Sequence, residues 1–293
     1  MPAFDHANDG PLTPLRAGLL GVVQGPAELL PISSTAHLGL VPKLGGWEWD
    51  RLDDGLRKDF EVALHAGAAL ALALDGIGLV RAEIGPGRRR GATAFALALL
   101  PAALAGFLAE DKVARHGTRP GVVAAGLFGG ALVMLAADRR RQWRPEAERI
   151  GPADGLALGI SQACALLPGV SRNGATLAVA RWRGFRRSRA DEISAAVGLP
   201  VIAGATALKT FRGLQRRRDP AARNAVAAGA AAAFLSTVLA AKVVGRRPGG
   251  RALTPFALYR IGLAAVIWYR NRPVGTGGEG QPGPAGIGSR IDE

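Results

Sequence analysis

Apolar residues occur in eight runs that are long enough to form helices and are separated by short polar segments. The runs lie near residues 15–30, 60–80, 92–109, 119–137, 153–168, 190–208, 224–244 and 253–269. Several of them carry almost no ionisable side chain. A helix needs about 20 apolar residues to cross roughly 30 Å of hydrocarbon. The pattern therefore predicts an all-α integral membrane protein with a polytopic helical bundle.

Two of the runs are too interrupted to be simple spans. Residues 15–30 and 153–168 both lead into Leu-Leu-Pro, at Pro31 and Pro168, and then into polar sequence rich in Ser or Gly. Proline removes a backbone donor and breaks the helical hydrogen-bond ladder. Freed backbone groups at membrane depth are tolerated only inside protein or beside a wet cavity. Both runs are therefore predicted to be re-entrant or broken helices.

The two interrupted runs also resemble each other in spacing. The nine-residue step from Gln24 to Ser33 equals the step from Gln162 to Ser171, and Leu-Leu-Pro precedes the serine in both. The likeness continues downstream, because Gly67 follows a Glu-Val pair as Gly198 follows a Glu-Ile pair, six residues after each glutamate. An internal duplication explains both matches.

The duplication defines a domain organisation. A single membrane domain is predicted over 1–270, with repeat one at about 15–110 and repeat two at about 153–270. Corresponding Gly/Pro-interrupted segments in two halves are typical of inverted-topology repeats with a binding site at their interface. The segment 271–293 is rich in Gly and Pro and is expected to be a disordered C-terminal tail.

The charge distribution gives a membrane orientation. The chain has 37 Lys and Arg against 23 Asp and Glu, a formal net charge of +14. The arginines gather between apolar runs rather than on one face, which argues against a nucleic-acid partner. Loop 42–59 is expected outside, and the net basic loops are expected in the cytoplasm: 81–91, 138–152, 181–189 and 245–252. Loop 212–223 is also basic but falls on the outer side, which this rule does not explain.

The first interrupted run carries the residues of a reaction site. Gln24 and Glu28 are four residues apart and share one helical face. An ionisable group inside an apolar segment is costly, so Glu28 is a functional-site candidate. Hydroxyl and imidazole groups follow it at Ser33, Ser34, Thr35 and His37.

The second interrupted run supplies a candidate phosphate cradle. Arg172 brings a planar guanidinium that binds phosphate through two parallel hydrogen bonds. Ser171, Asn173 and Thr176 surround it in sequence. Together the two runs offer a carboxylate for a metal, an imidazole for proton transfer and a guanidinium for phosphate charge.

Both motifs resemble the signatures of undecaprenyl-diphosphate phosphatases, which are also called bacitracin-resistance proteins. The likeness runs from about residue 15 to 270, and Pro255-Phe256-Ala257-Leu258-Tyr259-Arg260 is similar to another family stretch. The resemblance implies six transmembrane spans, two re-entrant helical hairpins and a place in the bacterial inner membrane, with the site facing the outer side. It also implies hydrolysis of undecaprenyl diphosphate, which recycles the lipid carrier for cell-wall synthesis. Besides this lipid substrate and membrane lipids, a homodimer is an expected partner.

The resemblance assigns roles to residues. Glu28, His37, Ser34 and Arg172 are expected to be catalytic. From the residues of the two motifs themselves, substrate is expected at Gln24, Ser33, Thr35, Ser171, Asn173 and Thr176. A divalent cation, Mg²⁺ or Ca²⁺, is expected at Glu28, with Gln24 and Glu61 as further candidate ligands. The nucleophile is either Ser34 or a metal-activated water. Asn173 and Ala36 depart from the usual family residues. Gln24 is one of the two residues that the family uses at its position, but it removes a possible anionic metal ligand. The number of ligands and the substrate geometry are therefore open.

Parts of the sequence are also compatible with other functions. A polyprenyl-phosphate flippase or transporter uses the same kind of broken-helix repeats and stays an alternative. Lys112, Arg119 and Pro120 match the opening of the acid-phosphatase superfamily motif, but the elements that must follow it are missing. For His65, four residues after Glu61, a buried structural role is favoured over a supporting role at the site.

Overall fold

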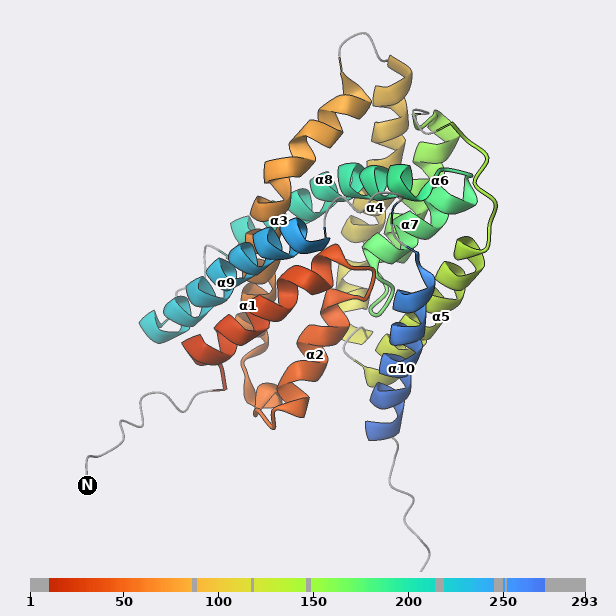
Figure 1. Ribbon diagram of the computed structural model, residues 1–293. Helices are drawn as coiled ribbons and strands as arrows, with labels where there is room; N and C mark the ends of the chain where they lie inside the picture. The colour runs from red at the N-terminus through yellow and green to blue at the C-terminus, as the bar shows by residue number, and fades with distance from the viewer. Residues whose placement is uncertain are drawn as a thin grey trace, which may run out of the picture.

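The computed structural model describes residues 11–85, 89–116, 119–145, 149–213, 219–244, 250 and 252–271, and in these ranges it is helical without β-strands (Figure 1). The elements in chain order are α1 (Pro14–Leu29), α2 (Ser34–Leu44), the 3₁₀ turn η2 (Trp49–Arg51), α3 (Asp54–Ile84), α4 (Arg89–His116), α5 (Pro120–Asp138), α6 (Pro152–Cys164), α7 (Arg172–Trp182), α8 (Arg187–Gly213), α9 (Pro220–Val244) and α10 (Thr254–Arg270). The expected tail, apart from Asn271, lies outside the described residues.

Several long helices in the described ranges are apolar enough to cross a membrane. By length and hydropathy, five of the helices in the described ranges can span a membrane, namely α3, α4 up to Ala109, α5, α8 up to Arg212 and α9. The sixth expected span corresponds to α10, which is apolar but only 17 residues long. The protein is therefore a multi-pass helical membrane protein.

The two interrupted runs form short helices that turn back at their prolines. α1 has 16 residues and α6 has 13, so at about 1.5 Å per residue neither spans the hydrocarbon layer. Each is followed by a helix of 11 residues, α2 or α7, with which it forms a hairpin. The turns of the two hairpins approach each other near the centre of the molecule (Figure 1).

Small residues allow α9 to hold both α1 and α3. A Cβ added at Gly21 of α1 would overlap the carbonyl of Gly229 on α9, and one at Gly25 would overlap Ser236. A Cβ at Gly67 of α3 would overlap the carbonyl of Ala230. Close backbone approach through small residues is how helices associate in lipid. The relative position of α1 and α3 is therefore set by backbone packing on a common partner.

α6 is packed against α4 in the same way. A Cβ at Gly155 would overlap the carbonyl of Ala94, and one at Gly159 would overlap the carbonyl of Leu97. α6 thus contacts a helix of the first half of the chain, as α1 contacts α9 of the second half.

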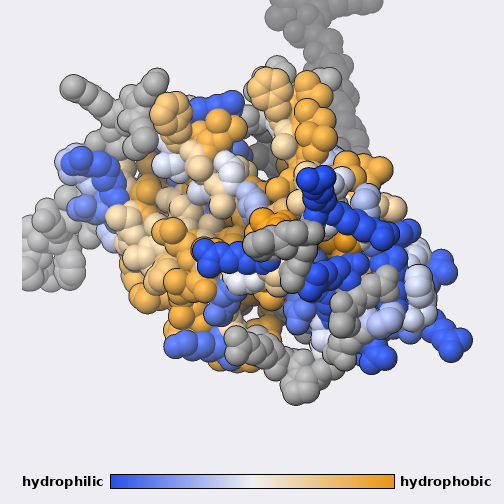
Figure 2. Space-filling view, turned by 90° about the horizontal axis from the view of Figure 1, so that it is seen from above, coloured by the Kyte–Doolittle hydropathy of each residue, from blue (hydrophilic) through white to orange (hydrophobic). Residues whose placement is uncertain are grey.

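Ion pairs gather where several helices end near the predicted basic loops. The carboxylate of Asp154 receives Arg144 at 2.9 and 3.1 Å and Arg183 at 2.6 Å. Asp138, at the end of α5, pairs with Arg181 at 2.6 Å. Seen from above, hydrophilic side chains are most dense on one side of the molecule, smaller hydrophilic groups lie elsewhere on its edge, and hydrophobic side chains cover much of the rest (Figure 2).

Candidate active site

The first hairpin brings a serine onto a buried carboxylate. Glu28 lies in the last turn of α1 and is 8% exposed. The chain turns sharply after Pro31, and Ser33 adopts a φ of 73°, a left-handed conformation that is uncommon outside glycine. This turn places Ser34 at the start of α2, where its hydroxyl donates to Glu28 Oε2 at 2.9 Å. A hydroxyl held against a carboxylate is the arrangement of a nucleophile beside its base.

The second hairpin delivers the arginine to the same carboxylate. Gly169 takes a φ of 89°, where a side chain would be strained and would also overlap α5. The Ser171 hydroxyl then caps α7 by accepting from the Gly174 N–H, which makes Arg172 the first residue of that helix. Its Nη2 donates to Glu28 Oε1 at 3.0 Å. Glu28 and Arg172, 144 residues apart, thus meet in one site, as expected from two interrupted segments with a binding site at their interface.

Gln24 and His65 complete the surroundings of Glu28. The Gln24 Nε2 group lies 3.3 Å from Glu28 Oε2 and 3.1 Å from His65 Nδ1, and His65 Nδ1 is 3.4 Å from Glu28 Oε2. The Gln24 Oε1 atom is buried and has no hydrogen-bond partner among the described residues. His65 is thus part of the site, although the sequence favoured a structural role for it. Its spacing from Glu61 on an apolar segment was the only available signal.

Two residues expected in the phosphate cradle bind protein groups instead. Asn173 donates from its amide to the Leu29 carbonyl at 2.6 Å and accepts from Ser194 of α8 at 2.7 Å. Thr176 donates to the Arg172 carbonyl and also contacts Ser194. These side chains therefore join the two hairpins and α8. In this geometry they support Arg172 rather than point to a ligand.

Thr35 and Ser33, which were also expected to bind substrate, are placed differently. Thr35 is exposed on α2 and makes none of the polar contacts of this cluster among the described residues. Ser33 is buried, and its carbonyl accepts a hydrogen bond from His37.

His37 lies one turn beyond Ser34 and is held in one tautomer. The Ser33 carbonyl can only accept, so the His37 Nδ1–H donates to it at 2.8 Å. In the neutral ring Nε2 then accepts from the Tyr259 hydroxyl of α10 at 2.6 Å. The two rings stack with centroids 5.7 Å apart. This pairing across 222 residues makes Nε2 a preorganised proton acceptor.

Arg260, the next residue on α10, ties the two hairpin turns together. Its guanidinium is fully buried and donates to the carbonyls of Pro31 at 3.3 Å and Gly169 at 2.9 Å. These carbonyls lie three residues after Glu28 and three before Arg172. Arg260 therefore sets the distance between the two reacting groups through the backbone.

The donor set fits a cation shared with a substrate better than a fully protein-bound one. No group of three or more His, Cys, Asp or Glu side chains with metal-binding spacing occurs in the described ranges. Glu28 offers carboxylate oxygens, and Gln24, whose Nε2 faces Glu28, has a buried Oε1 atom without a hydrogen-bond partner among the described residues. Mg²⁺ keeps several waters and often binds through one or two protein groups plus substrate phosphates. Glu61 interacts electrostatically with His65 one turn away, and in the described structure it makes no hydrogen bond to Glu28 or Gln24.

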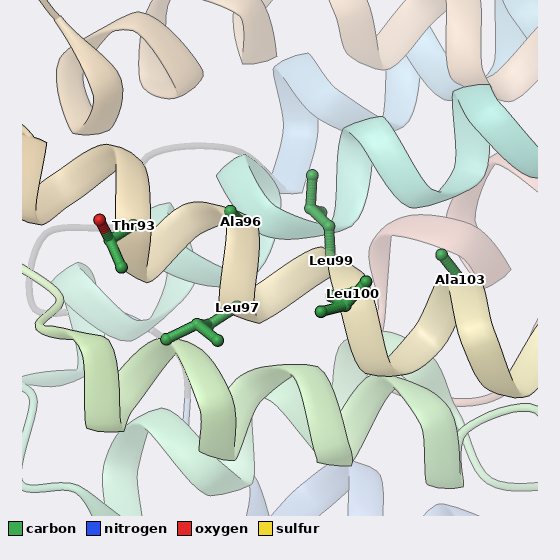
Figure 3. A pocket seen from close by; sticks show the side chains of 6 residues that line it. All are labelled: Thr93, Ala96, Leu97, Leu99, Leu100 and Ala103. Carbon is green, nitrogen blue, oxygen red and sulfur yellow. The ribbon is translucent and has the colours of Figure 1, made fainter.

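A surface hollow on α4 is lined by none of the residues of the Glu28–Arg172 site. It has a volume of about 460 Å³ and is lined by Thr93, Ala96, Leu97, Leu99, Leu100 and Ala103 (Figure 3). None of these side chains is ionisable, so the hollow carries no candidate chemistry.

Known proteins match this chain over most of its length. Residues 17–266 match the family described as "Bacitracin resistance protein BacA". The undecaprenyl-diphosphatase of Methylococcus capsulatus is 36% identical over 263 residues, which cover 86% of this chain and 93% of that protein. The undecaprenyl-diphosphatase of Geobacter metallireducens is 35% identical, covering 87% of this chain and 97% of that protein. A third, from Pelotomaculum thermopropionicum, is 33% identical and is covered over its full length.

Proposed function

The chain belongs to the bacitracin resistance protein BacA family, and we propose that its Glu28–Arg172 site hydrolyses undecaprenyl diphosphate to undecaprenyl phosphate and inorganic phosphate. The protein is an undecaprenyl-diphosphatase of the membrane, with a part in carrier-lipid recycling for the cell wall. The observation that carries the assignment to this site is the Glu28 carboxylate, which binds Arg172 through one oxygen and Ser34 through the other.

The protein groups around Glu28 divide the chemistry between them. Arg172 can exchange its contact with Glu28 for two phosphate oxygens, because a guanidinium binds such oxygens in parallel. It also lies at the N-terminus of α7, where the helix dipole favours negative charge. Glu28, released from the arginine but still bonded to Ser34, then serves as the general base.

Ser34 is the nucleophile that the geometry supports. Its Oγ attacks the terminal phosphorus, its proton passes to Glu28, and the bond to the bridging oxygen breaks to release undecaprenyl phosphate. Glu28 passes that proton to the departing phosphate group and is ionised again. A water then attacks the phosphorus of the phosphoserine and gives a proton to Glu28, the P–Oγ bond breaks, the proton returns from Glu28 to Ser34 Oγ, and inorganic phosphate is released. His37, with Nε2 held as an acceptor, is placed to move protons to and from this site. Direct attack by water is the competing route, and it forms no phosphoserine.

A divalent cation, Mg²⁺ or Ca²⁺, is proposed as cofactor. It would be held by Glu28 and Gln24 together with substrate oxygens, and when bound it would neutralise phosphate charge.

The architecture proposed for the full chain is an interdigitated pair of inverted repeats with six spans and two re-entrant hairpins. Supporting it, α1 packs on α9 while α6 packs on α4, and α3 packs on both α8 and α9. This is the exchange expected if α1–α5 and α6–α10 are equivalent. We place the protein in the inner membrane with the site open to the outer side. The acidic loop 42–59 between α2 and α3 supports this orientation, because acidic loops are expected outside. The arginines that pair with Asp138 and Asp154 at the opposite end support it too, because arginine-rich loops are expected in the cytoplasm.

Phosphate release by the purified, detergent-solubilised protein tests the proposal. The expected result is release from a polyprenyl diphosphate that stops with excess chelator and returns with Mg²⁺ or Ca²⁺. The Glu28→Gln variant, which keeps the size of the side chain, should be inactive. A protein that moves lipid across vesicles and releases no phosphate would instead be a flippase. Acid-quenched protein that carries phosphate on Ser34 would identify the nucleophile.

A further inference from the structure

A histidine outside both motifs lies against the reacting carboxylate. His65 is in the middle of α3, and its Nδ1 is 3.1 Å from Gln24 Nε2 and 3.4 Å from Glu28 Oε2. Its side chain is 31% exposed, so one part of the ring lies at the edge of the site. His65 belongs to neither motif, yet it contacts both Gln24 and Glu28 of the first one. The ring is therefore available to fix the two residues of α1 from a different helix.

The contact does not depend on a flexible segment. α1 and α3 both pack on α9 through glycines where no Cβ fits, at Gly25 and Gly67. Phe60, one and a half turns before His65, is fully buried and packs its ring against Gly229 of α9. The backbones that carry His65 and Gln24 are therefore held at a set distance. Only the side-chain torsions are left to be fixed.

Hydrogen bonding supplies that last constraint. Ionised Glu28 accepts from Arg172 at Oε1 and from Ser34 at Oε2, and the Gln24 amide reaches Oε2 at 3.3 Å. The same Nε2 group lies 3.1 Å from His65 Nδ1, which accepts from it in the neutral ring tautomer that carries its hydrogen on Nε2. Without the His65 acceptor the side-chain amide of Gln24 can rotate. Glu28 Oε2, which takes the Ser34 proton, then has no hydrogen-bond donor in a fixed position on α1.

We propose that His65 is a positioning residue that holds the Gln24 amide against Glu28 and thereby fixes the Oε2 atom that Ser34 uses. The inference rests on the proposed function of the Glu28 site. The role of His65 is to align the Glu28 base for the chemical step. Removal of His65 should therefore lower kcat and leave KM close to its original value. A hydrogen bond of this kind contributes about 0.5–1.5 kcal/mol, which corresponds to a change of roughly two- to tenfold in rate.

Three substitutions separate this role from simple packing. His65→Gln retains an acceptor that can reach the Gln24 amide, His65→Leu fills similar space without one, and His65→Ala removes both. Steady-state phosphate release from a polyprenyl diphosphate gives kcat and KM, and the melting temperature of each detergent-purified variant reports folding. We expect the Leu and Ala variants to lose about two- to tenfold in kcat at unchanged KM, with most of the loss recovered in the Gln variant. Equal kcat in the Leu and Gln variants would overturn the proposal.

A double-mutant cycle with Gln24→Ala gives an independent readout. If His65 acts through Gln24, His65→Leu should reduce kcat much less in the Gln24→Ala background than in the wild type. Full additivity of the two changes refutes the coupling. These outcomes are distinct from failure of the proposed function, in which the wild-type protein itself releases no phosphate.

Discussion

Gly198 on α8 decides where the Arg172 guanidinium can lie. A Cβ built at this glycine would overlap Nη1 of Arg172, whose Nη2 is 3.0 Å from Glu28. The Gly198→Ala substitution therefore tests the position of Arg172 without changing that residue. The atom that must move is the tip of a long side chain and not backbone. We expect the protein to fold while the guanidinium is pushed out of its place.

The magnitude follows from the phosphate contact that the displaced guanidinium can no longer make. A hydrogen bond to a charged group contributes about 1.5–3 kcal/mol, and each 1.36 kcal/mol is about tenfold in rate. The kcat/KM of Gly198→Ala should therefore fall by roughly 10- to 150-fold. The helix itself favours alanine over glycine by about 1 kcal/mol. The melting temperature should for this reason remain near that of the wild type.

Gly204, six residues further along the same helix, provides the matched control. A Cβ at Gly204 meets no atom within 4 Å. Gly204→Ala should therefore keep full activity while changing helix propensity by the same amount. The assay is phosphate release by purified protein, with thermal unfolding measured for both variants. A folded Gly198→Ala protein with wild-type kcat/KM would refute the requirement for this arginine position, and an equal loss in Gly204→Ala would attribute the effect to α8 as a whole.

Substitutions at three further residues test other parts of the structure. Arg172→Lys should lose at least about tenfold in kcat/KM because an ammonium binds as a single point, and activity near the wild-type level in Arg172→Ala would remove the residue from the site. Tyr259→Phe keeps the ring stacked on His37 but removes the hydroxyl 2.6 Å from Nε2; phosphate release should show kcat roughly two- to tenfold lower, and an unchanged kcat would dissociate this pair from catalysis. Burial raises the pKa of Asp154, but hydrogen bonds from Arg144, the Gly151 N–H and Arg183 outweigh it and hold the pKa below the ordinary 3.8. The stabilisation by ionised Asp154 is therefore present above pH 3.8 and is lost as the pH falls through the pKa of the folded state. The melting temperature of Asp154→Asn should lie well below that of the wild type at neutral pH and converge with it in acid. A constant difference in melting temperature from neutral to acidic pH contradicts this account.

Much of the site could be predicted because its chemistry is unusual for the surrounding sequence. Glu28 and Arg172 are ionisable groups beside Leu-Leu-Pro breaks in apolar runs, and helices of that kind cannot continue through a membrane. Equal spacing in the two halves then indicated that the breaks meet. The same reasoning assigned Asn173 and Thr176 to a ligand, because sequence spacing shows that a side chain is near a site but not which partner it binds.

Equal spacing also did not fix equal roles. Gly67 and Gly198 each follow a glutamate by six residues, yet Gly67 makes room for the backbone of α9 and Gly198 for the tip of Arg172.

The sequence by itself determined the helical membrane class, the two breaks and the residues that carry charge into the bundle. Only the tertiary structure decided that His65 meets Gln24, that Tyr259 meets His37 and that Arg260 binds both turns. The physical reason is that apolar helices in a membrane are nearly uniform in composition around their circumference. Their rotation and partners are set by close contacts between small residues, such as Gly25 with α9, and these contacts form between segments far apart in the chain.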